Sequence, residues 1–157
     1  MNKAKIFLIA ENFQFVGEPI SVTECMTGHI NSTYFIDCTS DEGIHRYVMQ
    51  IVNTSIFKKP DEVMENIIHV TKHIENKLIA SGGDSERGTL HVVYTKKNHY
   101  AHIDEEGQYW RAYEFVEDAT CYQAVESEEM FTKVGKAFGN FQKQLADFDA
   151  SVLYESF

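Results

Sequence analysis

Apolar residues in the first third of the chain follow two different patterns. In residues 4–15 the apolar positions recur with a helical period, and Gly17 with Pro19 ends that pattern. Three runs rich in β-branched and aromatic residues follow, and they are separated by Gly28 and by the turn cluster 40–43: ISVTECM, TYFIDC and RYVMQIV. The patterns predict a short amphipathic helix and then a three-stranded antiparallel meander.

The middle of the chain contains its most clearly marked helix. The helix is expected to begin at Pro60, to have acidic residues in its first turn and to end at 81–83, where a serine precedes two glycines. A polar loop at 84–89 leads to three more strand candidates: LHVVY, HYAHI and QYWRAYEF. Together these elements predict an α+β fold with an antiparallel sheet of five or six strands and one packed helix.

A long final helix is predicted over residues 127–146. Its apolar stripe consists of Phe131, Val134, Phe138, Phe141, Leu145 and Phe148. The small sheet cannot cover so long a stripe, so we expect the chain to self-associate through residues 127–157, most simply as a homodimer. The alternative is that the helix folds back within one chain. The closing SVLYESF has no polar tail, which is the pattern expected of a chain cut inside a larger protein.

Length, charge and cysteine content narrow the class of protein. The 157 residues fit one domain of ordinary globular composition. A net charge of -10 argues against nucleic acid or an anionic membrane as a partner, because both require clustered Lys and Arg. No stretch approaches the length of a membrane span. Three cysteines without close-paired spacing indicate reduced thiols and a cytoplasmic location.

The first hairpin turn, 27–33, combines a glycine with possible hydrogen-bond donors. Gly28 lets the backbone approach a ligand closely, and successive N–H groups in such a turn can form an anion-binding concavity. The alternative is a plain hairpin turn with an incidental histidine. In either case Gly28, His29 and Asn31 are expected to lie on an exposed turn.

Four blocks of sequence resemble one known family of enzymes. TGHINSTYFI, RYVMQIVNTSIF, YWRAYEFVEDATCY and KAFGNFQKQLADFDAS are similar to the N-acetylhexosamine 1-kinases, in the aminoglycoside phosphotransferase and choline kinase superfamily. The resemblance runs from about Ile20 to the last residue but covers only the front part of that family. It implies a protein-kinase-like small lobe over 1–117, then a hinge and the first helix of a missing helical lobe over 118–157. Some relatives are labelled mucin desulfatases, but none of the three cysteines has the sequence context of a sulfatase.

The resemblance implies two groups of binding residues. The turn would cover the nucleotide phosphates, and His29 and Asn31 would also border the acceptor sugar. The backbone at the lobe junction would hydrogen-bond the adenine edge. The nucleotide-binding set is Gly28, His29, Ile30, Asn31, Ser32, Glu114, Phe115 and Val116. Phe115 and Val116 can equally be ordinary strand core.

The third strand departs from the usual kinase pattern. Many kinases place a lysine there that contacts the phosphates and pairs with a glutamate of the next helix. Gln50 and Ile51 occupy that place, and Arg46 comes too early on the strand. The lysine–glutamate pair cannot be assumed, and Glu65 is interpreted as a solvated charge.

No catalytic residue can be assigned. Phosphoryl transfer in this superfamily uses a His-x-Asp-x-x-x-x-Asn loop and a later aspartate. His102-Ile103-Asp104 imitates the start of that loop, but Tyr109 replaces the asparagine and the tripeptide precedes the lobe junction, so we interpret it as a coincidence. No metal-ligand set is visible either.

The complete enzyme would transfer the γ-phosphoryl of ATP, with Mg²⁺, to the anomeric hydroxyl of an N-acetylhexosamine or a related sugar. The chain alone is expected to be inactive. Two other interpretations stay open: a non-catalytic nucleotide-binding or dimerising module, and an unrelated α+β protein with a chance glycine turn.

Overall fold

The computed structural model describes residues 2–28, 30–120, 122 and 124–155. The chain forms two compact units. The first comprises Met1–Glu65, Leu90–Phe115 and Tyr154–Phe157, and the second comprises Asn66–Thr89 and Val116–Leu153. The first unit holds the whole β-sheet.

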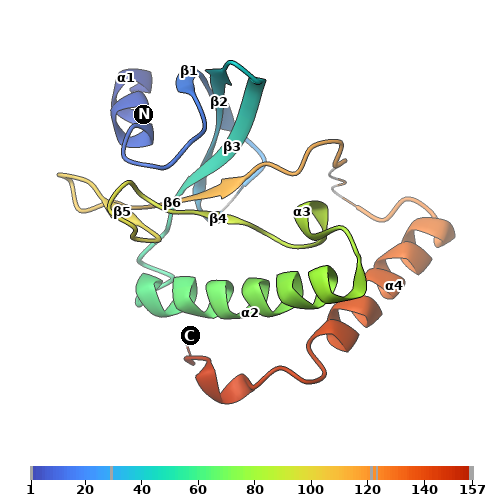
Figure 1. Cartoon of the computed structure of the whole chain (residues 1–157). Helices are drawn as coiled ribbons and strands as arrows, with labels where there is room; N and C mark the ends of the chain where they lie inside the picture. Colours follow the sequence, from blue (N-terminus) through green and yellow to red (C-terminus); the bar gives the residue numbers. More distant parts are fainter. Residues whose placement is uncertain (1, 29, 121, 123, 156–157) are drawn as a thin grey trace. The chain divides into compact units, whose positions relative to one another are not determined.

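The sheet has six strands, and all of its pairings are antiparallel (Figure 1). Its main order is β1-β2-β3-β6-β4, and β5 pairs with β6. The strands are β1 (Glu18–Cys25), β2 (Ser32–Ser40), β3 (Gly43–Ile51), β4 (Val92–Val93), β5 (His102–Ile103) and β6 (Tyr109–Glu114). The predicted α+β class, the initial meander and the number of strands are confirmed, although β4 and β5 are shorter than the apolar runs indicated.

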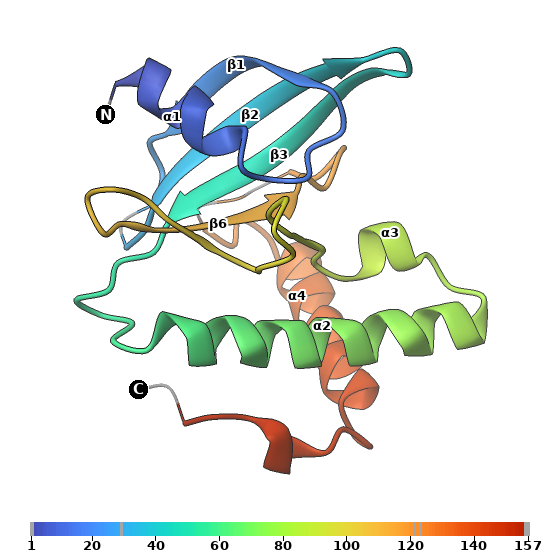
Figure 2. The same ribbon diagram turned by 60° about the vertical axis from the view of Figure 1, so that its left-hand side comes forward.

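One face of the sheet is the core of the first unit, and α1 (Lys3–Ala10) packs beside it (Figure 2). We call it the core face. Its side chains alternate along each strand with those of the other face, as the pleat requires. Its buried strand residues are Val22, Tyr34, Ile36, Cys38, Tyr47, Met49, Val93, Trp110 and Ala112.

The first helix ends earlier than its apolar period indicated, so the predicted range 4–15 is wrong at its carboxyl end. The Asn12 side-chain amide donates to the carbonyls of Leu8 and Ile9, which closes the helix. Phe13 is still buried, but as an isolated bridge partner of Thr95 in extended chain. The apolar period therefore continued beyond the helix because the same core buries both segments.

The second helix, α2 (Pro60–Ser81), has the bounds that the sequence predicts. Its first turns belong to the first unit, where Met64 is fully buried. The predicted polar loop 84–89 is wrong in one respect, because it contains the short helix α3 (Ser85–Gly88). Asp84 caps α3 by accepting a hydrogen bond from the Arg87 N–H.

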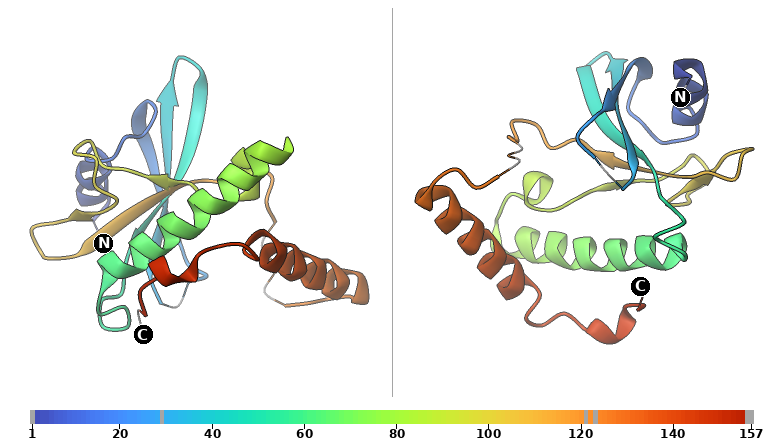
Figure 3. Two further views of the ribbon diagram at one scale, coloured as in Figure 1. Left: turned by 60° about the horizontal axis from the view of Figure 1, so that its bottom comes forward. Right: turned by 180° about the vertical axis from the view of Figure 1, so that it is seen from behind.

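The second unit also contains α4 (Glu128–Gln144) and a 3₁₀ turn, η1 (Ala150–Val152). The end of α4 is tied to α2, because Lys77 donates to the Gln144 carbonyl at 2.9 Å. Just beyond α4, Phe148 packs edge-on against His73. Figure 3 shows α4 followed by the short η1 turn near the end of the chain. The predicted final helix is thus present, and only its last residues are attached to α2 by described contacts.

Candidate functional site

The face of the sheet opposite the core carries polar and aromatic side chains, and we call it the polar face. β2 and β3 pair so that Phe35 faces Val48 and Asp37 faces Arg46, and β3 pairs with β6 so that Gln50 faces Arg111. The polar face consists of Thr33, Phe35, Asp37, Arg46, Val48, Gln50, Arg111 and Tyr113. It is where an antiparallel sheet of this kind can receive a polar ligand.

The first cluster on this face surrounds Phe115, directly after β6. Its ring meets Phe35 edge-on at 5.7 Å between centroids, and the Arg46 guanidinium lies 5.5 Å from the ring centre. Arg46 is neutralised by Asp37, with 2.6 Å between Nε and Oδ1. Arg46 and then Ser21 lower the pKa of Asp37 by hydrogen bonding, so the pair is charged at neutral pH. Phe115 is half-buried, so its exposure does not decide between strand core and a ligand-binding position, the two roles that the sequence leaves open.

The second cluster surrounds Arg111. Its Nε donates to Gln50 Oε1 at 3.0 Å, and Gln50 Nε2 donates to Thr33 Oγ1 at 3.0 Å. The guanidinium lies 5.2 Å from the centre of the Tyr113 ring. On the helix side it meets Met64, whose sulfur is 3.8 Å from Nη1. The neutral thioether of Met64 therefore lies next to the Arg111 guanidinium.

The turn between β1 and β2 is largely exposed over its described residues. Gly28 and Ile30 are exposed, but Asn31 is half-buried, so the expectation that it is exposed is wrong; His29 lies outside the described residues. The pKa of Cys25 is lowered by hydrogen bonds from the Thr27 side chain and then from the Thr27 and Gly28 backbone. Cys25 Sγ lies 3.2 Å from Thr27 Oγ1, so this part of the turn folds back on the end of β1. The phosphate role of Gly28, Ile30 and Ser32 stays a prediction.

The side-chain carbonyl of Asn31 makes a hydrogen bond within the protein. Its Oδ1 accepts a hydrogen bond from the Asn53 N–H at 2.9 Å, which ties the turn to the chain just after β3. This bond uses one of the two lone pairs of the carbonyl oxygen, and no described hydrogen bond uses the amide NH₂ group. The expected role of Asn31 at the sugar stays a prediction.

The backbone after β6 is partly used by the sheet. The Glu114 N–H donates to the His91 carbonyl at 3.0 Å, and the Phe115 N–H donates to the Arg46 carbonyl at 3.1 Å. These two donors are therefore not available to an adenine edge. Of the three residues expected to bind adenine, Val116 has the backbone donor that comes next along the chain.

Asp104 serves the fold. Its side chain is 5% exposed and pairs with Lys5 at 2.9 Å. It also accepts hydrogen bonds from the Gln108 N–H, the Glu106 N–H and Trp110 Nε1. Burial opposes its ionisation, but the hydrogen bonds outweigh burial and hold the pKa of Asp104 at about 2. The carboxylate closes the β5–β6 turn onto α1.

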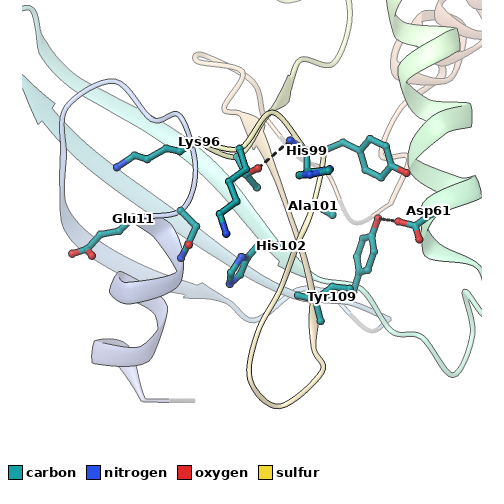
Figure 4. Close-up of a pocket in the computed structure, with 12 residues that line it drawn as sticks. Glu11, Asp61, Lys96, His99, Ala101, His102 and Tyr109 are labelled. Carbon is teal, nitrogen blue, oxygen red and sulfur yellow. Dashed lines mark hydrogen bonds between the residues drawn. The ribbon is translucent and has the colours of Figure 1, made fainter.

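A cavity of about 380 Å³ lies beside this turn, and no sequence pattern predicted it (Figure 4). His99, His102 and Lys96 line it, with Glu11 at the end of α1. At its inner wall the Tyr109 hydroxyl donates to Asp61 Oδ1 at 2.8 Å. This hydrogen bond joins β6 to the start of α2.

The contact between Tyr100 and Glu65, next to this cavity, corrects the expectation that Glu65 is a solvated charge. Glu65 is half-buried and accepts a hydrogen bond from the Tyr100 hydroxyl at 3.3 Å, so it is not simply a solvated charge. Burial, then the Asp61 and Glu65 charges, raise the pKa of Tyr100 to about 12. Burial and Asp61 also raise the pKa of Tyr109.

The described residues contain neither a cluster of metal-ligating side chains nor a helix that could span a membrane. Across residues 2–28, 30–120, 122 and 124–155, no group of three or more His, Cys, Asp or Glu side chains could hold a metal ion. In the same part of the chain, no helix is both long and apolar enough to cross a membrane. Cys121, like His29, lies outside the described residues.

Arg111 is the residue that sequence reasoning missed. Alternation along QYWRAYEF places it on one face with Tyr109 and Tyr113, opposite Trp110. That signal was available in the sequence. The pairing of Arg111 with Gln50, 61 positions away, was not, because register between distant strands is set by packing.

Comparisons with known proteins support the fold. No protein-family profile matches the chain. Among solved structures it is similar to the spectinomycin phosphotransferase APH(9)-Ia, determined in complex with ADP and spectinomycin, with a TM-score of 0.57 and 12% sequence identity. The match covers 97% of this chain and 40% of that one. The chain therefore has the α+β fold of a kinase-like small lobe, and it spans well under half the length of the protein it matches.

Proposed function

We propose that the chain is the nucleotide-binding part of an ATP-dependent phosphotransferase whose acceptor is a small sugar, with N-acetylhexosamines as the first candidates. The observation that carries the proposal is the polar face. On a protein of net charge -10, this face presents a half-buried guanidinium beside aromatic rings. Such a surface suits a ligand with a flat base and several phosphates.

In this proposal, different residues contact the base and the phosphates of the nucleotide. Phe35, Val48 and Phe115 offer apolar surface to the base, and Val116 offers the backbone donor for its edge. The N–H groups of the 27–32 turn take the phosphates, as glycine-containing turns do elsewhere. ATP supplies the γ-phosphoryl group when it is bound. The chain's own residues bind and orient, which is most of what phosphoryl transfer requires of a protein.

The choice of acceptor rests on the resemblance of four sequence blocks, the first of which is residues 27–36, to the N-acetylhexosamine 1-kinases. In this proposal the Asn31 amide NH₂ and His29 border the sugar. The related fold in the spectinomycin phosphotransferase binds a different acceptor, so fold alone does not choose between them. Spectinomycin is therefore the informative comparison ligand.

Binding and turnover test different parts of this proposal. We expect the chain to bind ATP with Mg²⁺, and N-acetylglucosamine added afterwards to shift the NMR signal of the Asn31 side-chain amide, whereas spectinomycin does not. We expect no sugar 1-phosphate above background, because Asp104 is held in the fold. Absence of ATP binding would refute the proposal. Turnover that disappears in Asp104→Asn would refute the assignment of Asp104.

A second candidate function is a self-associating, non-catalytic module. The exposed apolar stripe of α4 favours it, since Phe131 is 71% exposed and Phe138 is 67% exposed. The partner in this case is a second copy of the chain, joined through α4. This proposal is independent of nucleotide binding, and sedimentation tests it separately.

A further inference from the structure

The described contacts of the Arg111 guanidinium are all with neutral groups. Its described contacts are the Gln50 amide oxygen at 3.0 Å, the Met64 sulfur at 3.8 Å and the Tyr113 ring at 5.2 Å. Among the residues that the structure describes, no carboxylate lies within ion-pair distance of its guanidinium. A half-buried charge without a counter-charge is unusual in a protein with 24 acidic and 14 basic residues.

Not all donors of Arg111 are used by described contacts. A guanidinium has five N–H groups, and only Nε makes a close hydrogen bond here. No described side-chain nitrogen or oxygen is buried without a hydrogen-bond partner. Nη1 contacts only the Met64 sulfur, and Nη2, for which no hydrogen bond is described, is not completely buried. The two terminal nitrogens form a fork that suits two oxygens of one anion.

Arg46 provides the contrast on the same face. It is paired with Asp37 at 2.6 Å, and its positive charge is neutralised within the sheet. The cation of Arg111 is held in a fixed orientation by Gln50 and Tyr113 but is not neutralised. Of the two arginines, only Arg111 is arranged to attract a further anion.

The position of Arg111 in the sheet indicates which anion it binds. Gln50 occupies the place on β3 where many kinases carry a phosphate-binding lysine, and strand register puts Arg111 directly beside it. We propose that Arg111 is the cation that holds the polyphosphate of the nucleotide, replacing the lysine absent from β3, and that Gln50 orients its guanidinium. This inference rests on the proposed function, because it specifies how the same site recognises its nucleotide.

The expected recognition depends on phosphate and not on the base. Hydrogen bonds between charged groups are worth enough to change affinity by about 10- to 100-fold. ATP and ADP should therefore lose that factor when Arg111 loses its charge. Adenosine, which has no phosphate, should bind equally well with or without it.

The test is an NMR titration of the ¹⁵N-labelled chain with ATP, ADP and adenosine. We expect ATP, but not adenosine, to shift the Arg111 Nε–H signal. Arg111→Gln should weaken ATP at least about tenfold and leave adenosine within about twofold. Arg87→Gln makes the same charge change at an exposed residue of α3 and should leave both ligands unaffected. The amide spectrum of each variant verifies its fold.

A rescue variant keeps the test valid if Arg111→Gln loosens the sheet. In Arg111→Gln/Gln50→Lys the cation returns on the neighbouring strand, and ATP affinity should recover most of its loss. Equal ATP affinity in the wild type and Arg111→Gln would overturn the inference and leave the proposed function intact. Failure of the wild type to bind ATP at all would overturn both.

Discussion

Trp110, the single tryptophan of the chain, donates from its indole Nε1 to Asp104 Oδ2 at 3.1 Å. The ring is fully buried under α1, and the acceptor belongs to the tripeptide that imitates a catalytic loop. The carboxylate is thus a structural element of the β5–β6 turn.

Replacing this carboxylate should destabilise the fold. Asp104→Ala leaves the buried indole N–H and two backbone N–H groups without their acceptor, so the free energy of unfolding should fall by about 3 kcal/mol. Urea denaturation followed by Trp110 fluorescence measures the loss. The matched control is the exposed neighbour in Glu105→Ala, which should change stability by less than about 0.5 kcal/mol. Equal effects of the two changes would contradict the structural role.

The same group predicts how stability depends on acid. The folded pKa of Asp104 is about 2, below the ordinary value near 4, so its contribution is present above pH 4 and is lost as pH falls from about 4 to 2. Asp104→Asn has no such titration. Its unfolding curves should therefore converge with those of the wild type between pH 4 and pH 2. A constant difference between them across this range would show that the pKa is not lowered.

Gly17 and Gly107 offer a paired test of backbone geometry. Both have positive φ, 85° and 76° respectively. A Cβ at Gly17 would overlap the Thr39 carbonyl, whereas one at Gly107 would meet nothing within 4 Å. Gly107→Ala should cost about 1 kcal/mol from conformation alone, and Gly17→Ala clearly more, about 3 kcal/mol or above. Thermal unfolding that ranks them in the opposite order would contradict the packing of the segment before β1.

The tyrosines beside the cavity should ionise late. Burial and the carboxylates of Asp61 and Glu65 raise the pKa of Tyr100 to about 12, and that of Tyr109 is raised as well. Because the folded values lie above the ordinary value near 10, the stability that these groups contribute is present below pH 10 and is lost as pH rises beyond it. Absorbance at alkaline pH measures the ionisation. Asp61→Asn should bring the late ionisation to lower pH, and an unchanged curve would contradict the Tyr109–Asp61 contact.

The exposed stripe of α4 predicts association of the chain. Each buried Phe contributes roughly 1.5 to 3 kcal/mol relative to exposure, so pairing of Phe131 and Phe138 across two copies should be favourable at micromolar concentration. Sedimentation should show a dimer, and Phe138→Asp should return it to an 18 kDa monomer. Lys136→Asp on the same helix is the control for added negative charge. A wild-type monomer would contradict the prediction.

Local patterns were sufficient for most elements. β-branched alternation located β1, β2 and β3, and Pro60 with two acidic residues located the start of α2. The first helix was overextended because Phe13 satisfies the helical period while lying in a strand-like bridge. α3 was missed, although Asp84 before Ser-Glu-Arg is an ordinary capping signal.

The candidate site was predicted less completely than the fold. The sequence drew attention to Gln50 as a missing lysine, but only the register of β3 with β6 shows that Arg111 lies beside it. It also could not show that Asn31 bonds to Asn53 or that the Phe115 N–H is used by the sheet. These are contacts between segments distant in sequence, and no local pattern encodes them.

The most direct test of the account is to locate bound nucleotide on the sheet with the Mn²⁺ complex of ATP, whose unpaired electrons broaden nearby NMR signals. We predict broadening of the amides of Thr33, Gln50 and Arg111 on the polar face. Ile6 and Ile9 of α1, on the core face, should stay sharp, as should every signal when Mn²⁺ is added without ATP. Broadening centred on His99 and His102 at the cavity, or no ATP-dependent broadening anywhere, would contradict a nucleotide-binding polar face.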